Sequence, residues 1–271
     1  MHITEFVANL KRQDYSGRTT NLYVIALRHV LRSAMDDGYL KESPAARVKW
    51  QRFDTPKRTL VEPAQIDALC EAALAPKYFE SRLAKPGEQG VCLKNGVQLV
   101  DFIRLLQYSG AREQEAIALR WADLDLERRL LTIGADGNTK NREPRHVDLN
   151  PKLLAVLEEM EARRAPDSEW LFPSPRRGER DTHAKTFRES LKLARAAAGM
   201  PKFGFHDCRH CFVSYAVMSA IDFMTIARWV GHKDGGVLIG KVYGHIADSH
   251  RRTMAQQLSF GPTALKEVAK A

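Results

Sequence analysis

Two short strand patterns, set among recurring helix patterns, limit the folds that this chain can adopt. Residues 130–133 and 145–149 have the length and composition of strands, whereas the other apolar segments repeat at the spacing of amphipathic helices. The connection over residues 134–144 contains two glycines and a proline, which predicts a hairpin with a wide tip. The sequence therefore predicts a mainly α-helical fold with a small antiparallel β-sheet.

Helix signals begin at the N-terminus. Ile3 starts an i, i+3, i+4, i+7 apolar pattern over residues 3–12, and Ser16 is a favourable N-cap for a second helix of about twenty residues. The residues expected on the inward face of the second helix are Leu22, Ile25, Ala26, His29 and Val30. Further helices are predicted from Pro63 through Cys70, and over residues 97–108, 151–164, 184–198 and 246–258.

A polar segment separates the N-terminal helices from the rest of the chain. No apolar periodicity crosses residues 52–58, and Pro56 disfavours helix at Thr55. With 271 residues, the chain is long enough for two moderate domains. The predicted organisation is a short helical domain over 1–52, a linker over 53–59, a second domain over 60–258 and a C-terminal tail over 259–271.

The net charge suits a polyanionic partner. The chain has 42 lysines and arginines against 33 acidic residues, a net charge of +9, and residues 1–60 hold 11 basic against 6 acidic residues. Such an excess is typical of nucleic-acid-binding proteins, although a solvated surface also explains it. No apolar run reaches the roughly 20 residues that span a bilayer, and the N-terminus lacks a signal-peptide pattern. We expect a soluble, intracellular protein.

Side chains of complementary chemistry concentrate in residues 204–245. His206 and Arg209 form an H-x-x-R unit, His232 follows a glycine that closes an apolar helix, and Tyr243 stands in Lys-Val-Tyr-Gly-His. A phenol can attack phosphorus, imidazoles can move protons, and a guanidinium can bind two phosphate oxygens. Together these groups predict phosphoryl transfer without a metal ion.

A Cys-x-x-Cys pair in the same segment raises the alternative of a zinc or redox site. On one straight helix, Cys208 and Cys211 point roughly opposite to His206 and His210, so the four side chains cannot converge on one metal ion. We therefore predict no metal and no cofactor, with both cysteines facing the core. Reduced thiols are expected at all four cysteines, which lack a disulfide spacing: Cys70, Cys92, Cys208 and Cys211.

The order of these residues resembles the signature of the tyrosine recombinases, the phage integrase family. The matching segments are YSGAREQEAIALRWADLD at 108–125, HDCRH at 206–210, ARWVGHKD at 227–234 and KVYGH at 241–245. The resemblance covers residues 60–258 as a catalytic domain and, more weakly, residues 1–50 as part of a DNA-binding domain. The catalytic residues that it implies are Arg112, Lys140, His206, Arg209, His232 and Tyr243.

Three of these residues would act directly on the scissile phosphate. By the resemblance, Tyr243 attacks phosphorus and leaves a 3′-phosphotyrosyl link with a free 5′-hydroxyl. Arg112 and Arg209 would hold the non-bridging oxygens and stabilise the charge that grows in the transition state. Because the phosphotyrosine retains the energy of the broken bond, rejoining would need no nucleotide cofactor.

The other three residues would transfer protons or position the reacting groups. The resemblance assigns Lys140 to protonation of the leaving 5′-oxygen, with Arg142 and Arg145 as alternatives in the same segment. His206 would accept the phenol proton or position the nucleophile, and His232 would hydrogen-bond to the phosphate.

Three segments carry further expectations from the resemblance. The glycine-rich run over 234–240 suggests a mobile nucleophile segment, and an ordinary flexible loop explains it as well. The segment from residue 246 onward either docks on a neighbouring subunit or packs on its own domain. The N-terminal domain, with two strong helices, is shorter than the four or more helices usual in the family.

The resemblance implies a site-specific recombinase that cleaves and rejoins double-stranded DNA as a homotetramer on paired sites. Accessory DNA-bending proteins are further expected partners, no membrane is involved, and the setting is the nucleoid in a prokaryotic cytoplasm. Two other functions stay open: a non-cleaving DNA-binding regulator of recombination, and a type IB topoisomerase, which shares this chemistry.

Overall fold

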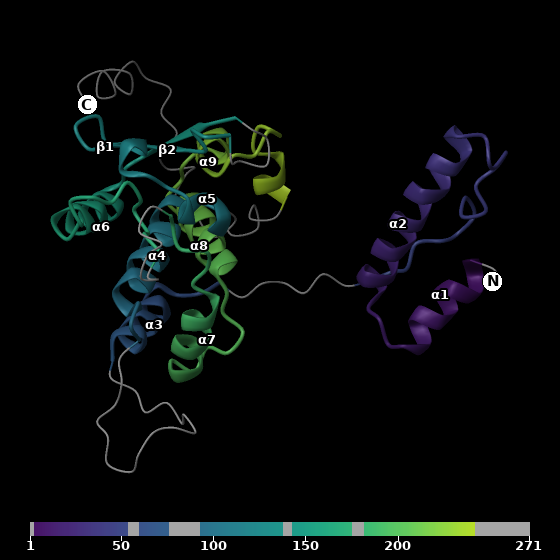
Figure 1. Cartoon of the computed structure of the whole chain (residues 1–271), viewed down its shortest axis with the longest axis horizontal. Coiled ribbons are helices and arrows are strands. Elements are labelled where there is room, and N and C mark those ends of the chain that lie inside the picture. The colour runs from purple at the N-terminus through teal and green to yellow at the C-terminus, as the bar shows by residue number, and fades with distance from the viewer. Residues whose placement is uncertain (1–2, 54–59, 76–92, 138–142, 175–181, 242–271) are drawn as a thin grey trace, which may run out of the picture. The chain divides into compact units, whose positions relative to one another are not determined.

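The computed structural model describes residues 3–53, 60–75, 93–137, 143–174 and 182–241 (Figure 1). Contacts group the chain into two units, Met1–Thr59 and Leu60–Ala271. The described residues are mainly helical and include one small antiparallel sheet, which confirms the predicted fold class. Among them, no helix combines the length and apolar character needed to cross a membrane.

Two helices and a returning segment form the first unit. Helix α1 spans Ile3–Arg12 and α2 spans Gly17–Asp36, which confirms both predicted helices. The Ser16 hydroxyl accepts a hydrogen bond from the Thr19 N–H at 3.1 Å, as expected of an N-cap. The chain after α2 then turns back along the helix and is held there by side chains of α2.

Hydrogen bonds from α2 fix the returning segment. Asn21 accepts from the Gln51 N–H at 2.8 Å and donates to the Gln51 carbonyl at 2.9 Å. Arg28 donates to the carbonyls of Ala45 and Val48 at 3.3 and 2.9 Å. These bonds satisfy backbone groups of a segment that contains neither helix nor strand.

The buried face of α2 is not the predicted one. The five residues predicted to face inward are all exposed, with Val30 at 68% and Leu22 at 57%: Leu22, Ile25, Ala26, His29 and Val30. Asn21 and Val24 are buried instead. The helix carries apolar residues on two faces, and the hydrogen bonds from Asn21 and Arg28 decide which face the returning segment covers. The apolar periodicity of the helix does not show which of its two apolar faces is buried.

Helix α4, Gly96–Ser109, lies at the centre of the second unit and packs against α3, α6 and α8 (Figure 1). Its Phe102 ring lies 5.1, 5.0 and 5.1 Å, between centroids, from the rings of Phe172, Phe187 and Phe205. Buried aromatic clusters of this kind contribute strongly to a core. The surrounding helices are α3 (Pro63–Leu74), α6 (Pro151–Ala162), α7 (Arg188–Ala197) and α8 (Phe205–Met218).

One predicted helix starts later than expected. Helix α7 begins at Arg188, whereas its pattern predicts a start at residue 184. The Ala184 N–H donates instead to the Phe172 carbonyl at 2.8 Å, so this stretch pairs with a distant segment of the chain. The starts predicted for the helices at Pro63 and Pro151 are confirmed, and α4 begins at Gly96, one residue before the predicted start.

Three antiparallel strands form the sheet in the order β1-β2-β3. They are β1 (Leu124–Asp125), β2 (Leu130–Ile133) and β3 (Arg145–Asp148). Leu131 pairs with Val147 and Ile133 with Arg145, and the three apolar residues are buried. The predicted strands β2 and β3 are confirmed, whereas the two-residue β1 is too short to produce a strand pattern. Residues 138–142 of the predicted connection over 134–144 lie outside the described residues.

A second, smaller apolar cluster supports the last described helix. Helix α9, Phe223–Val230, packs against α8 and β3. The apolar residues of this cluster are Val213, Ala216, Val217, Ile226, Ala227, Val230 and Ile239. Gly231 ends α9 in the left-handed conformation at φ +68°, which confirms the predicted glycine cap. Two short elements, α5 (Glu113–Ile117) and the 3₁₀ helix η1 (Trp121–Asp123), connect α4 to the sheet.

Candidate active site

The turn between α4 and α5 fixes the position of Arg112. Gly110 ends α4 at φ +65°, and a Cβ atom on it would lie 2.4 Å from the Phe212 ring. Only glycine therefore fits this turn without strain. The Ser109 hydroxyl donates to the Leu105 carbonyl at 2.6 Å and accepts from the Ala111 N–H at 3.2 Å. Arg112 follows as the N-cap residue of α5.

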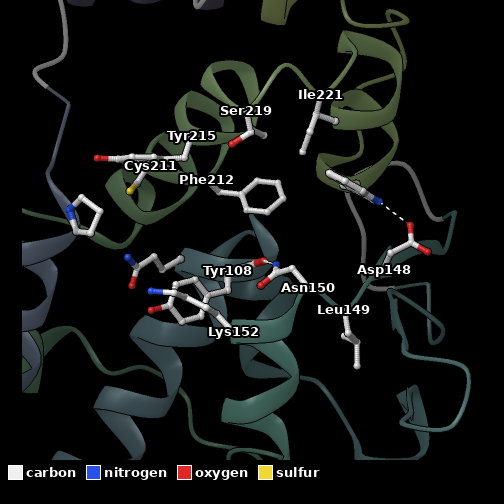
Figure 2. A pocket seen from close by; sticks show the side chains of 14 residues that line it. Tyr108, Asp148, Leu149, Asn150, Lys152, Cys211, Phe212, Tyr215, Ser219 and Ile221 are labelled. Carbon is white, nitrogen blue, oxygen red and sulfur yellow. Dashed lines mark hydrogen bonds between the residues drawn. The ribbon is translucent and has the colours of Figure 1, made fainter. Parts of the chain in front are cut away.

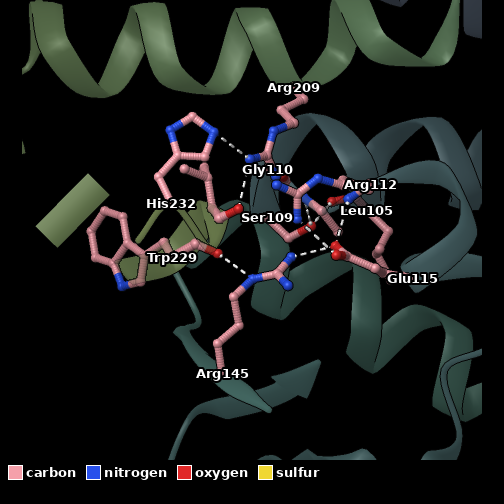
Figure 3. A network of polar contacts seen from close by, with 11 residues as sticks. Leu105, Ser109, Gly110, Arg112, Glu115, Arg145, Arg209, Trp229 and His232 are labelled. Atoms are coloured by element: carbon pink, nitrogen blue, oxygen red, sulfur yellow. Dashed lines mark hydrogen bonds and ion pairs between the residues drawn. The ribbon is translucent and has the colours of Figure 1, made fainter. Parts of the chain in front are cut away.

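A buried carboxylate holds Arg112 in place (Figure 3). Glu115 has a side chain only 3% exposed, and its Oε1 accepts from Nη1 of Arg112 at 2.8 Å. Its Oε2 accepts from the Arg112 N–H at 3.1 Å and from Nη2 of Arg145 at 2.5 Å. Burial acts to raise the pKa of Glu115, but the hydrogen bonds and charges of Arg145 and Arg112 outweigh it and lower the pKa. Glu115 is therefore anionic near neutral pH.

Glu115 is a site residue that the sequence argument missed. It stands three residues after Arg112, at the third position of α5, where a carboxylate commonly caps the N-terminus of its own helix. The three-residue spacing from Arg112 was the sequence signal that could have identified Glu115. No sequence pattern predicts the contact of Glu115 with Arg145, which lies 30 residues away.

Arg209 is buried on α8 and bridges two helix ends. Its Nη1 donates to the Gly110 carbonyl at 2.7 Å, and its Nη2 donates to the Val230 carbonyl at 2.6 Å. The same Nη2 lies 3.1 Å from Nε2 of His232. Because a guanidinium has no acceptor, Nε2 of His232 must accept this hydrogen bond. Arg209 thus joins the α4–α5 turn, α9 and His232.

The contact with Arg209 sets the chemistry of His232. Burial, followed by the positive charge of Arg209, lowers the pKa of His232, which favours the neutral imidazole. With Nε2 accepting, the remaining proton is on Nδ1. Nδ1 is buried and has no hydrogen-bond partner within the described part of the chain. The described residues therefore leave this N–H without an acceptor.

The H-x-x-R unit lies on α8, with its two members in different environments. His206 is exposed on the first turn of α8, where its ring lies 4.7 Å from that of His210, between centroids. Arg209, one turn later, is buried. Cys208 and Cys211 are buried and face the core as predicted, and burial raises the pKa of Cys211 to about 11. In that environment the two thiols are packed in the core and are chemically inert.

Arg145 makes two structural contacts through its guanidinium group. Its Nε donates to the Trp229 carbonyl at 2.8 Å, its Nη2 binds Glu115, and its side chain is 10% exposed. Gly231 lies against it, because a Cβ atom there would be 3.1 Å from Cδ of Arg145. The other two candidates for the general acid, Lys140 and Arg142, lie outside the described residues.

A basic pocket opens beside these residues. It has a volume of about 360 Å³ and is lined by Arg112, Glu143, Pro144, Arg145, His146, Ala227, Arg228, Gly231, His232 and Lys233. Four of the lining residues are lysine or arginine and one is acidic, and that Glu143 pairs with Lys233 at 2.8 Å. Such a lining suits a phosphate group.

A larger, mostly apolar cavity of about 590 Å³ lies behind the site (Figure 2). Phe212 and Trp229 line it, and both also support the active site: Phe212 contacts the Gly110 turn and the Trp229 carbonyl binds Arg145. The indole N–H of Trp229 donates to Asp148 at 2.8 Å. The cavity and the basic pocket therefore share their supporting residues.

The glycine-rich run over 234–240 is partly packed, with Gly236 and Ile239 buried. Asp234 accepts hydrogen bonds from the N–H groups of Gly236 and Leu238, and residues 237–241 are helical. A Cβ atom on Gly236 would lie 2.6 Å from the Phe223 carbonyl, so close packing accounts for this glycine. Tyr243 lies outside the described residues, and the expectation of a mobile nucleophile segment stays a prediction.

Comparison with known proteins gives a consistent result. Residues 62–250 match the phage integrase family. The chain is 27% identical to tyrosine recombinase XerD of Caulobacter vibrioides, over 94% of this chain and 79% of that protein. It is 26% identical to tyrosine recombinase XerA of Thermococcus onnurineus, over 91% of this chain and 77% of that protein.

Solved structures share the fold at lower sequence identity. The integrase of transposon Tn1549, in complex with transposon right end DNA, superposes with a TM-score of 0.69 at 17% identity, over 94% of this chain and 84% of that one. A lambda integrase dimer bound to a COC′ core site gives a TM-score of 0.63 at 14% identity, over 86% and 78%. Because the family match covers more than half of the sequence, this chain belongs to the phage integrase family, the tyrosine recombinases.

Proposed function

We propose that this protein is a site-specific recombinase that cleaves and rejoins duplex DNA through a 3′-phosphotyrosyl intermediate. The observation that carries the proposal is that Arg209 joins His232 to the turn that precedes Arg112, beside a basic pocket lined by Arg112 and His232. A guanidinium has several N–H groups, so carbonyls can fix its plane while other N–H groups bind phosphate oxygens with little reorganisation during the reaction.

His232 acts as a neutral hydrogen-bond donor in this proposal. Its Nε2 is engaged by Arg209, and its lowered pKa keeps the ring uncharged near neutral pH. The Nδ1–H then donates to a phosphate oxygen without adding a further formal charge to a site that already holds several arginines.

The nucleophile and the general acid are assigned by resemblance to the family. The phenol oxygen of Tyr243 forms a bond to phosphorus while the bond from phosphorus to the 5′-oxygen breaks. Lys140 gives a proton to that 5′-oxygen, and His206 takes the phenol proton or orients the phenol. Rejoining runs the same steps in reverse with a 5′-hydroxyl as the nucleophile, so bond energy is conserved. Tyr243 and Lys140 lie outside the described residues.

We further propose that the N-terminal unit binds DNA and that the active form is a homotetramer on paired sites. The basic excess within residues 1–60 supports DNA binding. The apolar cavity of about 590 Å³ supports assembly, because an apolar segment of a neighbouring subunit fits a site of this character. Accessory DNA-bending proteins and a place on the nucleoid of a prokaryotic cytoplasm belong to the same proposal.

A trapping experiment tests the reaction. Nicked duplexes that tile the DNA flanking the gene are incubated with wild-type protein and with Tyr243→Phe, and covalent adducts are resolved on a denaturing gel. The nick lets the short 5′-hydroxyl fragment diffuse away, so the phosphotyrosyl adduct accumulates. We expect an adduct with one site for the wild type and none for Tyr243→Phe.

Binding and plasmid-relaxation assays run beside the trapping experiment distinguish the other functions. Salt-dependent binding to one site with no wild-type adduct indicates a non-cleaving regulator. Relaxation of supercoiled plasmid without sequence preference indicates a topoisomerase. Equal trapping by wild type and Tyr243→Phe shows that Tyr243 is not the nucleophile.

A further inference from the structure

Two of the three guanidinium nitrogens of Arg145 form hydrogen bonds with described residues (Figure 3). From the first position of β3, Nε donates to the Trp229 carbonyl at 2.8 Å and Nη2 donates to Glu115 at 2.5 Å. The third nitrogen, Nη1, also has N–H groups to donate. Within the described part of the chain, these N–H groups have no acceptor.

This third nitrogen lies at the wall of the basic pocket. A Cβ atom on Gly231 would be 3.3 Å from Nη1 of Arg145, and Gly231 and the next residue, His232, both line the pocket with Arg145. Arg112 lines it as well, and Arg112 binds Oε1 of the carboxylate whose Oε2 binds Arg145. Because both arginines bind Glu115, their guanidinium groups lie close together in the pocket.

The two bonds of Arg145 restrain its side chain before any ligand binds. The side chain is 10% exposed, so both bonds form in a site largely shielded from water, where charge-assisted bonds are strong. A side chain that is already ordered loses less conformational entropy on binding a ligand. Arg228, which also lines the pocket, is exposed by contrast. Arg145 therefore has the preorganisation that stabilises growing charge in a reaction.

The charge balance around Arg145 favours an anion. Among the described residues, Glu115 is the carboxylate that binds both Arg112 and Arg145, so these three side chains together carry a positive charge. The acidic residue that lines the pocket, Glu143, is 67% exposed and pairs with Lys233 at 2.8 Å. A phosphate in the pocket would supply negative charge and acceptor oxygens for Nη1.

We propose that Arg145 binds a non-bridging oxygen of the scissile phosphate through Nη1, as a third arginine beside Arg112 and Arg209. The inference rests on the proposed function, because this phosphate is the one that Tyr243 attacks. Arg145 transfers no proton. It stabilises the negative charge on the phosphate oxygens while the bond from phosphorus to the phenol oxygen forms and the bond to the 5′-oxygen breaks.

The test removes the charge that Arg145 is proposed to bind. Nicked duplexes of the site trapped by the wild type carry at the scissile position either the normal phosphodiester or a methylphosphonate, in which a methyl group replaces one non-bridging oxygen and the group is neutral. The two methylphosphonate diastereomers are used separately, and another duplex carries the methylphosphonate at the neighbouring phosphate. The rate of covalent adduct formation is measured for wild type, Arg145→Ala and Arg145→Lys.

We expect Arg145→Ala to slow the reaction of the phosphodiester by about 10²-fold, as for the loss of one oxyanion donor. On at least one scissile methylphosphonate, its rate should come within a few-fold of wild type on the same duplex, because the charge that requires Arg145 is absent. The methylphosphonate at the neighbouring phosphate should restore nothing. Arg145→Lys keeps a cation beside Glu115 but loses the guanidinium fork, so it should show the same pattern with a smaller defect, about 10-fold.

DNA binding without cleavage gives an independent measurement. In the Tyr243→Phe background, the affinity for the phosphodiester duplex is measured against salt concentration. Each lost phosphate contact makes the plot of log affinity against log salt less steep by about 0.9, and Arg145→Ala should show this change. The matched control is Arg163→Ala, which removes an arginine bound to Asp101 by two bonds at 3.1 and 3.0 Å in another part of the unit. It should leave the rate and the salt dependence unchanged.

Three results overturn the inference: equal defects of Arg145→Ala on all duplexes, restoration by the neighbouring methylphosphonate alone, or an unchanged salt dependence. If Arg145→Ala does not fold, by circular dichroism, Arg145→Lys decides on the same criteria. If the wild type reacts with the phosphodiester but with neither scissile methylphosphonate, the salt dependence decides. Absence of a wild-type adduct with every duplex that tiles the flanking DNA instead refutes the proposed function, and the salt dependence on those duplexes still decides whether Arg145 binds a phosphate.

Discussion

Replacing Glu115 by glutamine should strongly destabilise the second unit. The carboxylate is 3% exposed and accepts hydrogen bonds from Arg112 and Arg145. Glutamine keeps the shape but turns an N–H₂ group toward one of the two guanidinium groups and leaves their charges uncompensated. Breaking a buried ion pair by removing one partner costs about 3–5 kcal/mol. At about 2–4 °C per kcal/mol for a unit of this size, the lower figure corresponds to a fall in Tm of about 6–12 °C.

Glu113→Gln is the matched control, because Glu113 lies on the same short helix and also pairs with an arginine. Its partner Arg188 is 69% exposed, so this pair contributes at most about 1 kcal/mol. The measurement is thermal unfolding by calorimetry at pH 7. If the two substitutions lower Tm equally, the buried network does not stabilise the unit in the way that its geometry indicates.

The effect of Glu115→Gln should also depend on pH. The pKa of Glu115 in the folded state lies below its usual value of 4.5. The carboxylate therefore stabilises the fold fully above pH 4.5, and this contribution is lost as the pH falls through the lower folded pKa. The Tm difference between wild type and Glu115→Gln should be constant from pH 7 to about 5.5 and should shrink below 4.5. A difference that grows on acidification would contradict the assignment of an anionic Glu115.

Two further substitutions test the turn and the buried arginine. Gly110→Ala should cost about 2 kcal/mol or more, because the left-handed backbone and the contact with the Phe212 ring both oppose a Cβ atom. Gly199→Ala, at φ +70° with open space around it, isolates the backbone cost and should lower Tm less in the same melting experiment. Arg209→Lys should slow adduct formation by about 10²-fold or more, because one ammonium cannot span two carbonyls and a histidine. Arg195→Lys, which replaces an arginine with one carbonyl contact, should leave the rate unchanged.

Local signals in the sequence predicted the elements that carry the site. Ser16, Gly231 and the turns around Pro63 and Gly110 define helix ends through capping and positive φ, which depend on a few adjacent residues. The strand composition of β2 and β3 likewise depends on four adjacent residues in each strand. These features were predictable because the residues that determine them are neighbours in the chain.

Contacts between distant segments were not predictable in the same way. Arg145 was considered only as an alternative to Lys140, yet it binds partners 30 and 84 residues away in the sequence. The exposed face of α2 is a similar case, because hydrogen bonds from Asn21 to Gln51 select one of two possible faces. Periodicity describes one helix at a time and contains no information on which partner covers it.

The ends of two helices explain how the site holds its arginines before any phosphate arrives. Arg209 binds the carbonyls of Gly110 and Val230, and Arg145 binds that of Trp229. These carbonyls belong to the C-terminal ends of α4 and α9, where backbone acceptors lack helical partners and the helix dipole is negative. The two helix ends thus stabilise a layer of cations.

That layer has more positive charge than its protein partners neutralise. Among the described residues of the network, Glu115 is one carboxylate shared by Arg112 and Arg145, while Arg209 is held by neutral carbonyls. Burial and then the charge of Arg209 lower the pKa of His232, so a further cation is disfavoured there. A bound phosphate would supply the missing negative charge. The glycines at 110 and 231 matter for this reason: each ends its helix where the carbonyls face an arginine.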